Sequence, residues 1–266
     1  PLALFIRGKI NTPSDTLSIG VVGTRRHTTY GKEVCIKICN ELAKNKVTIV
    51  SGLALGIDSF AHQSALENNG KTIAVLGSGI DRDSIYPRYN LKLAERIIKN
   101  DGALISEYPP DTKPTSFSFP ARNRIIAGLT QGILVIEAPE QSGSLITARR
   151  ALDYNREVMA VPHPINSESG AGNNELIKKG AALVSSVQDI FESFNWKYLN
   201  NIQDKKTEGL TPEEKKMLEA LAKETLQIEK ISNTVDLPSE KILSTLTFLE
   251  MRGLIKNLGG GYYAKI

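Results

Sequence analysis

Four segments rich in glycine, serine and threonine follow predicted β-strands and are suited to binding phosphate. They are Gly23–Arg26, Ser51–Gly56, Gly77–Gly79 and Ser142–Thr147. In an open parallel sheet, ligands bind outside the carboxyl ends of the strands, so these segments are expected to meet at one edge. Glycine allows close approach of the backbone, and free N–H groups at helix N-termini attract anions. One such loop is typical of any strand-to-helix turn, but four at one edge favour a phosphate or nucleotide site.

Basic and aromatic side chains are expected at the same edge. The basic residues are Arg25, Arg26, Lys113, Arg122 and Arg124, and the Pro-rich loop 108–120 adds Phe117 and Phe119. Arginine binds phosphate oxygens through paired hydrogen bonds, and unpaired bases stack on aromatic rings. The combination points to single-stranded nucleic acid. Each phenylalanine taken alone is better explained as a core plug beneath the long loop.

The sequence lacks the patterns of several common enzyme classes. The first loop reads GTRR instead of the Gly-x-Gly-x-x-Gly pattern of dinucleotide binding, and no Gly-rich lysine loop is present. No histidine or cysteine has zinc-site spacing, and no nucleophile stands beside a base. Asp58 and His62, four residues apart, are expected to form a hydrogen-bonded pair on one helix face. We therefore predict no metal, no cofactor and no catalytic residue.

Short apolar runs alternate with longer amphipathic stretches through the first 190 residues. Predicted strands cover 18–22, 47–50, 72–76, 103–106, 133–137, 157–161 and 182–184, with one more in the opening LALFIRG. Helical patterns lie near 30–45, 57–68, 88–99, 122–129, 144–154 and 173–180. Such alternation predicts an α/β fold, with a parallel sheet between helices on both faces. The strand runs are continuously apolar, as is typical when both faces of a sheet are covered.

The last sixty residues follow a different pattern. The polar stretch 196–210 is predicted to be a linker, and 211–266 is predicted to form three helices and a hairpin around Gly259–Gly261. This layout is that of a small winged-helix domain. Residues 207–266 have a net charge of −1, whereas the rest of the chain has +5 and eleven of the twelve arginines. The expected recognition helix, 238–252, has no basic excess, which favours contact with a partner or the main domain over reading duplex DNA.

Length and composition suit a soluble protein with one large and one small domain. The chain has 266 residues, 41% of them hydrophobic, and a net charge of +4. No apolar run approaches the roughly 18 residues of a membrane span, and PLALFIRGKI is not a signal peptide. Cys35 and Cys39 share a helix face and are expected to be buried thiols in a reducing cytosol. These features predict a cytoplasmic location without membrane contact.

Six sequence blocks resemble the DNA-processing protein A family, also called Smf. They are VVGTRRHTTYG (21–31), SGLALGIDSFAHQSAL (51–66), GSGIDRDSIYPRYN (77–90), ISEYPP (105–110), FPARNRIIAGL (119–129) and EAPEQSGSLITARRAL (137–152). The blocks follow the family's order within residues 1–195, and the final sixty residues resemble the winged-helix module of many members. Many members also begin with a helical domain that this chain, which starts at Pro1, does not show.

The resemblance implies an extended Rossmann-like fold and a non-enzymatic function in natural transformation. Family members bind single-stranded DNA, load a RecA-type recombinase onto incoming DNA, and usually act as homodimers. Matched by motif, Arg25 takes the place of the arginine in the family's Gly-Ser-Arg loop, with Thr24 in place of serine. The predicted DNA-binding residues are Arg25, Arg26, Ser51, Gly52, Lys113, Phe119, Arg122, Asn123, Arg124, Ser142, Gly143, Ser144 and Thr147. The expected domains are 1–195 and 211–266, joined by 196–210.

Two other functions remain open from the sequence. The first is a nucleotide-cleaving enzyme, because related Rossmann-like phosphoribohydrolases bind a 5′-phosphate in a similar loop. In this chain Arg149 and Arg150 stand where the acid of that loop would follow, which argues against glycosidic cleavage. The second is a transcription regulator built on the winged helix, which the neutral recognition helix disfavours.

Overall fold

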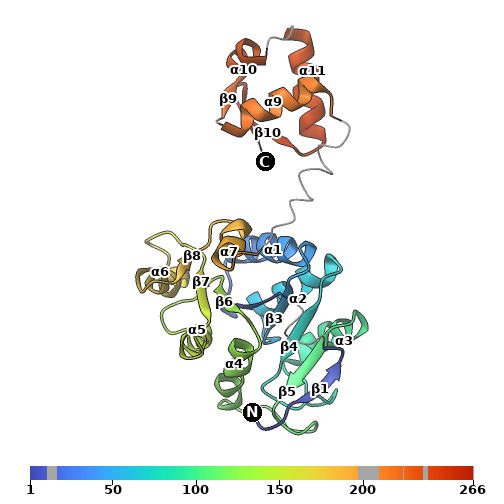
Figure 1. Cartoon of the computed structure of the whole chain (residues 1–266), viewed down its shortest axis with the longest axis vertical. Coiled ribbons are helices and arrows are strands. Elements are labelled where there is room, and N and C mark those ends of the chain that lie inside the picture. Colours follow the sequence, from blue (N-terminus) through green and yellow to red (C-terminus); the bar gives the residue numbers. More distant parts are fainter. Residues whose placement is uncertain (11–16, 197–209, 224, 236–238, 266) are drawn as a thin grey trace. The chain divides into compact units, whose positions relative to one another are not determined.

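The chain folds into two units, each of which is described by itself. The computed structural model describes residues 1–10, 17–196, 210–223, 225–235 and 239–265. Its units are Pro1–Tyr198 and Leu199–Ile266 (Figure 1). The predicted linker 196–210 lies almost entirely outside the described residues.

An eight-stranded sheet forms the centre of the larger unit. Its strands are β1 (Phe5–Gly8), β2 (Ser18–Val22), β3 (Thr48–Ser51), β4 (Thr72–Val75), β5 (Ala103–Ser106), β6 (Gly132–Val135), β7 (Glu157–Ala160) and β8 (Ala182–Leu183). The spatial order is β1-β5-β4-β3-β2-β6-β7-β8. All neighbours from β5 to β8 run parallel, and only β1 is antiparallel, with Phe5 opposite Ser106. The predicted α/β fold with a mainly parallel sheet is confirmed.

Seven helices in the described part of the larger unit cover the two faces of this sheet. They are α1 (Thr29–Lys44), α2 (Ile57–Glu67), α3 (Leu91–Lys99), α4 (Ser118–Gly128), α5 (Gly143–Asp153), α6 (Ala171–Lys178) and α7 (Val187–Ser193). Short 3₁₀ turns, η2 (Arg88–Asn90) and η3 (Glu168–Gly170), precede α3 and α6. Buried side chains place α1, α2, α3 and α7 on one face and α4, α5 and α6 on the other (Figure 1).

The continuous apolar strands supply both of these cores. Ile19 and Val21 of β2 pack towards α1 and α2, whereas Val22 packs towards α4 and α5. Because adjacent residues of a strand point to opposite faces, a strand covered on both sides needs apolar residues throughout. The two cysteines, Cys35 and Cys39, are buried and free in the α1 side of this core, as predicted.

Two helices differ from the sequence-based expectation. Helix α4 begins at Ser118, four residues before the predicted start, and therefore includes Pro120 in its first turn. Proline is tolerated there because first-turn N–H groups have no partner within the helix. Before the helix, the N–H of Ser118 donates to the Thr115 hydroxyl, and the N–H of Thr115 donates to the Ser118 hydroxyl. Helix α7 was not expected; its capping box joins Ser186 to Asp189.

The smaller unit is a winged helix. It consists of α9 (Pro212–Lys223), β9 (Leu226–Gln227), α10 (Ile228–Val235), α11 (Ser239–Met251), β10 (Ile255–Gly259) and β11 (Tyr262–Lys265). The strands form one sheet in the order β10-β11-β9, and a separate apolar core joins them to the helices. This confirms the predicted three helices and hairpin. No helix in the described part of the chain has the length and apolar character needed to cross a membrane.

A buried histidine lies between α2 and the sheet. The His62 side chain is fully buried, and its Nδ1 is 2.7 Å from the Thr72 hydroxyl oxygen. That hydroxyl donates its own proton to the Ile49 carbonyl, so it accepts from His62 and fixes the proton on Nδ1. The expected hydrogen bond between Asp58 and His62 is wrong, because Asp58 accepts from backbone N–H groups of Gly52 and Ala54 instead.

Protonation of His62 is predicted to destabilise the fold as the pH falls. Burial, with the Arg122 charge adding to it, lowers the pKa of His62 from 6.5 to about 3. Between these values the unfolded chain binds a proton that the folded chain excludes, so stability falls with pH through this window. At pH 5 this costs about 2 kcal/mol of unfolding free energy.

Urea denaturation at pH 7 and pH 5 measures the effect. The unfolding free energy should fall between pH 7 and pH 5 by about 2 kcal/mol more in the wild type than in His62→Gln, and this difference is attributed to His62. A wild-type chain and a His62→Gln variant with the same pH dependence would contradict the prediction.

Candidate functional site

A pocket lies where the sheet changes its winding direction. From β2 the chain builds outwards through β3, β4 and β5, and it then returns to the other side of β2 with β6. A pocket of about 620 Å³ opens above this point, between the loops that follow β2 and β6. Crevices of this kind are the usual ligand sites of open α/β sheets.

The N-terminus of α5 forms one wall of the pocket. The Ser142 hydroxyl caps the helix by accepting from the N–H of Ser144, and the two hydroxyl oxygens are 2.6 Å apart. A Cβ on Gly143 would meet no atom within 4 Å, so the backbone is open to a ligand there. The positive end of the helix dipole and two hydroxyls together suit an anion.

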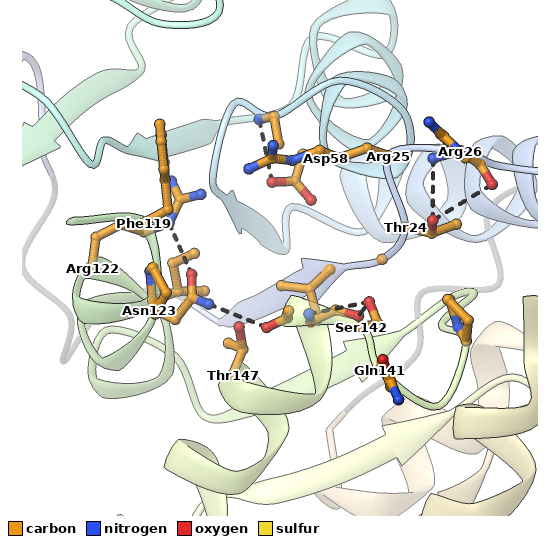
Figure 2. A pocket seen from close by; sticks show the side chains of 18 of the residues that line it. Thr24, Arg25, Arg26, Asp58, Phe119, Arg122, Asn123, Gln141, Ser142 and Thr147 are labelled. Carbon is orange, nitrogen blue, oxygen red and sulfur yellow. Dashed lines mark hydrogen bonds between the residues drawn. The ribbon is translucent and has the colours of Figure 1, made fainter. Parts of the chain in front are cut away.

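Two exposed arginines lie on the opposite wall. Arg25 and Arg26 follow β2, and no carboxylate pairs with either of them among the described residues. Their loop is held at its start, because the N–H of Thr24 donates to the Glu137 carbonyl and the N–H of Arg26 donates to the Thr24 hydroxyl. Both arginines thus lie across the pocket from Ser142 at the start of α5 (Figure 2).

Arg122 forms part of the pocket floor, and the residue is only 5% exposed. It donates to the carbonyl oxygens of Gly52, at 2.6 Å, and of Val75, and its Nε donates to the Asn123 side chain at 2.9 Å. The Asn123 amide in turn donates to the Gly143 carbonyl. The side chain therefore links the ends of β3 and β4 to α4, and through Asn123 to the start of α5 (Figure 2).

Asp58 provides the opposite charge for Arg122. Its carboxylate accepts from the N–H groups of Gly52 and Ala54 at 3.0 and 3.3 Å. Burial raises the pKa of Asp58, although Arg122 and these N–H donors act against the rise. Burial lowers the pKa of Arg122 to about 10, with Asp58 opposing that change. Each charge therefore lowers the cost of burying the other.

The position of Arg122 explains the glycine at residue 52. A Cβ there would lie 2.4 Å from the guanidinium carbon, which is too close for any side chain. Gly52 therefore acts on the pocket through Arg122. Ser51 is fully buried in β3 and its hydroxyl donates to the Val21 carbonyl, so the expectation that it offers a hydroxyl to a ligand is not met.

The structure brings together most, but not all, of the predicted DNA-binding residues. Those that line the pocket are Arg25, Arg26, Phe119, Arg122, Asn123, Ser142, Gly143, Ser144 and Thr147. Arg124 is outside its lining and forms an ion pair with Glu107, and Lys113 is exposed on the loop before α4. Because α4 starts at Ser118, Arg122 lies in its second turn and is buried there, whereas the sequence suggested an accessible position.

The loop Gly77–Gly79 does not join the other Gly-rich loops in the pocket lining. Ser78 is buried, and a Cβ on Gly79 would lie 2.0 Å from the Pro110 carbonyl oxygen. This loop therefore packs against the Pro-rich loop 108–117 and supports it. Three of the four predicted loops contribute to the pocket lining, through Gly23–Arg26, Ala54 and Ser142–Thr147.

The two phenylalanines of the Pro-rich loop have different environments. Phe117 is 84% exposed, so it is not a core plug. Phe119 is half-buried at the pocket wall, where the Arg25 guanidinium carbon lies 5.5 Å from its ring centre. Sequence reasoning missed Gln141, Ser116 and Asp58 as lining residues. No spacing signal marks the first two, and Asp58 was assigned to His62.

The recognition helix of the winged-helix unit, α11, presents few charges. Glu250 lies in its last turn, and Arg252 follows directly after it. The Arg252 guanidinium carbon lies 4.8 Å from the centre of the Phe248 ring. Leu243, Phe248 and Met251 are exposed on the same helix. A helix that reads a DNA groove needs a basic excess for the phosphates, and α11 has none.

Comparison with known proteins gives matches along the whole chain. The sequence profile of the family described as DNA recombination-mediator protein A matches residues 1–195, and that of the DprA winged helix domain matches residues 203–261. Protein Smf of Escherichia coli is 39% identical over 269 residues, which cover 98% of this chain and 71% of that protein. DNA processing protein DprA of Bacillus subtilis is 45% identical over 192 residues, covering 72% of this chain and 64% of that protein.

A solved structure gives a match to the larger part of the chain. It is DNA processing protein A from Helicobacter pylori, described as giving insight into its single-stranded DNA binding mode. The TM-score is 0.64 at 35% sequence identity, over 72% of this chain and 86% of that chain. The present chain thus spans about two thirds of the length of the two sequence relatives.

Removal of the Arg122 charge is predicted to destabilise the larger unit. Arg122→Met leaves Asp58 buried without its counter-charge, which costs about 3–5 kcal/mol of unfolding free energy. The double variant Arg122→Met with Asp58→Asn loses less, because no buried charge remains. Urea denaturation measures both.

A matched control is Arg124→Met, which removes an arginine from the partly exposed pair with Glu107. Its expected loss is about 1 kcal/mol or less. If Arg122→Met is as stable as this control, Arg122 does not stabilise the larger unit in the way described.

Proposed function

The chain belongs to the DNA recombination-mediator protein A family, and on that premise we propose that its larger unit binds single-stranded DNA and loads a RecA-type recombinase onto it. The observation that carries the proposal is the pocket at the switch point of the sheet. There the α5 N-terminus, with the Ser142 and Ser144 hydroxyls, lines the same pocket as Arg25 and Arg26. This arrangement suits the phosphates of a strand whose bases are free.

Single strands fit this site better than duplex DNA. A pocket of about 620 Å³ has room for a nucleotide unit, but a base inside a duplex cannot enter it without leaving its stack. Phe119 offers a ring at the pocket wall on which an unpaired base can stack. The relative from Helicobacter pylori, described as binding single-stranded DNA, supports the same use of the fold.

The predicted contacts divide into two groups. Arg25, Arg26 and the start of α5 are proposed to contact the strand directly. Arg122 and Gly52 are proposed to act indirectly, because the guanidinium is held by the ends of β3 and β4 and by Asn123. Lys113 and Arg124 lie outside the pocket lining, so any contact they make is with parts of the strand beyond it.

A non-enzymatic function is proposed as well. Asp58 is the one acid among the described residues that line the pocket, and backbone N–H groups of Gly52 and Ala54 already bind its carboxylate. Hydrolysis of a glycosidic bond needs a free carboxylate near the sugar. Steady release of free base from nucleoside monophosphates would contradict this proposal and favour the phosphoribohydrolase alternative.

We further propose that the protein works as a cytoplasmic homodimer in natural transformation, as the family resemblance implies. Apolar side chains at one end of the sheet support self-association, since Leu152 of α5, Tyr154 directly after α5 and Leu183 of the edge strand β8 are exposed. Light scattering that gives the mass of a single chain at micromolar concentration would contradict the dimer.

Neutralising the two pocket arginines is predicted to weaken DNA binding. Arg25→Gln with Arg26→Gln should lower the affinity for a mixed-sequence single strand about tenfold or more for each lost phosphate contact. The slope of log affinity against log salt should fall by about 0.7 for each of them. Fluorescence anisotropy at two salt concentrations measures both quantities, on single strands and on duplex.

The control is Arg96→Gln, which removes an exposed arginine on α3 that lines no part of the pocket. It should bind as the wild type does. Equal affinity and slope for the double variant and the control would contradict the assigned site.

Recombinase loading is predicted to depend on the same arginines. On a strand coated with single-strand binding protein, the wild-type chain should shorten the lag before a RecA-type recombinase hydrolyses ATP. The variant with Arg25→Gln and Arg26→Gln should leave the lag unchanged, because it no longer reaches the strand. A wild-type chain that binds the strand without shortening the lag would contradict the mediator function and leave strand binding in place.

A further inference from the structure

A second, narrower cleft adjoins the pocket on the side of β3 and β4. Its volume is about 40 Å³, and Arg25, Ala54, Phe119 and Arg122 line both cavities. Two large apolar side chains line only the second cleft. They are Leu55 from the loop after β3 and Tyr86 from the loop after β4. The two cavities thus form one continuous surface with the Phe119 ring between them.

The apolar groups of this cleft are unusually accessible. Leu55 is 42% exposed and Tyr86 is 46% exposed. The ring centres of Tyr86 and Phe119 are 5.6 Å apart with their planes at 45°, so the rings form an open wedge. Large apolar side chains exposed together next to a polar site mark a place where a partner binds.

The size of the cleft decides how a ligand uses it. A volume of about 40 Å³ is close to that of a single water molecule, so an aromatic base cannot enter. A base can instead lie across the opening, with its face on Tyr86 and its edge against Leu55. Tyrosine offers a large face at a low entropic cost because few of its bonds rotate.

Arg25 lies between the cleft and the pocket and contacts both. Its guanidinium is 5.5 Å from the Phe119 ring centre, and no carboxylate pairs with it among the ion pairs of the described residues. Contact with a ring leaves the N–H groups at the guanidinium edge available for a phosphate. A strand that crosses Arg25 would therefore have one nucleotide in the pocket and the neighbouring base over the cleft.

We propose that Leu55 and Tyr86 form a second base-binding platform, on which the nucleotide next to the one in the pocket stacks. The inference rests on the proposed binding of single-stranded DNA and adds a source of its selectivity. Both faces of a base are covered in a duplex, so only an unpaired strand can use Tyr86. The platform recognises bases, whereas Arg25, Arg26 and the α5 N-terminus recognise phosphates.

The test compares Tyr86→Ala with Tyr86→Phe by anisotropy on a single strand of mixed sequence. Loss of the ring should weaken binding roughly five- to hundredfold, as is typical of one lost base stack. The salt slope should stay unchanged because no charge is removed. Tyr86→Phe should bind as the wild type does. The matched control is Tyr262→Ala, which removes a ring of 45% exposure from the winged-helix unit and should also be neutral.

A strand with abasic sugars in place of nucleotides separates stacking from other effects. On it the wild type and Tyr86→Ala should bind equally, because phosphates remain and bases do not. If Tyr86→Ala melts at a lower temperature than the wild type, Tyr86→Leu replaces it in the test. Leucine keeps apolar contact with Phe119 but has no ring face, so this variant should show the same loss of affinity.

Three outcomes would overturn the platform. They are an unchanged affinity of Tyr86→Ala on the normal strand, an equal loss on the abasic strand, and full affinity of Tyr86→Leu. If one of these outcomes occurs while the variant with Arg25→Gln and Arg26→Gln still loses affinity as predicted, the platform is wrong but the proposed function stands. A wild-type chain that binds no single strand would overturn both.

Discussion

The buried guanidinium of Arg122 is the contact on which the site depends. It joins the carbonyl ends of β3 and β4, binds Asn123, and is neutralised by Asp58, which also holds the backbone of Gly52 and Ala54. A planar group with several donors in a fixed geometry suits this task, and the flexible ammonium of lysine does not. The ends of β3 and β4 are therefore held by the hydrogen bonds of one buried arginine, with Asp58 as the opposite charge nearby.

Much of the fold could be predicted from the sequence because the strands are short, continuously apolar and separated by clear helical patterns. All eight predicted strands are present. The start of α4 was missed because SFSFP contains two serines and a proline, which usually mark a loop, and the reciprocal bonds between Thr115 and Ser118 depend on the three-dimensional turn. Helix α7 has only 7 residues, which is too short for a periodic pattern.

The sequence predicted which residues line the pocket better than it predicted which of them are exposed and which are buried. Arg25 and Arg122 look alike in sequence, because each lies in a short motif with a second arginine. One is exposed and the other is buried, because α4 directs Arg122 under the sheet edge at a point where Gly52 leaves space for it. Tyr86 lies in one of the blocks that resemble the family, but nothing in the sequence marked it as a contact residue. Its relevance follows only from its distance to Phe119.

The antiparallel pairing of β1 with β5 determines where the first residues of the chain lie. Phe5 is opposite Ser106, at the carboxyl end of β5, so residues before Phe5 start at the same edge of the sheet as the pocket. Four strand spacings separate β1 from β2, or about 19 Å, which an extended segment of about six residues can span. A substitution that adds a charge or a ring just before Phe5 would therefore be placed along the same edge as the pocket, although it lies far from the pocket in sequence.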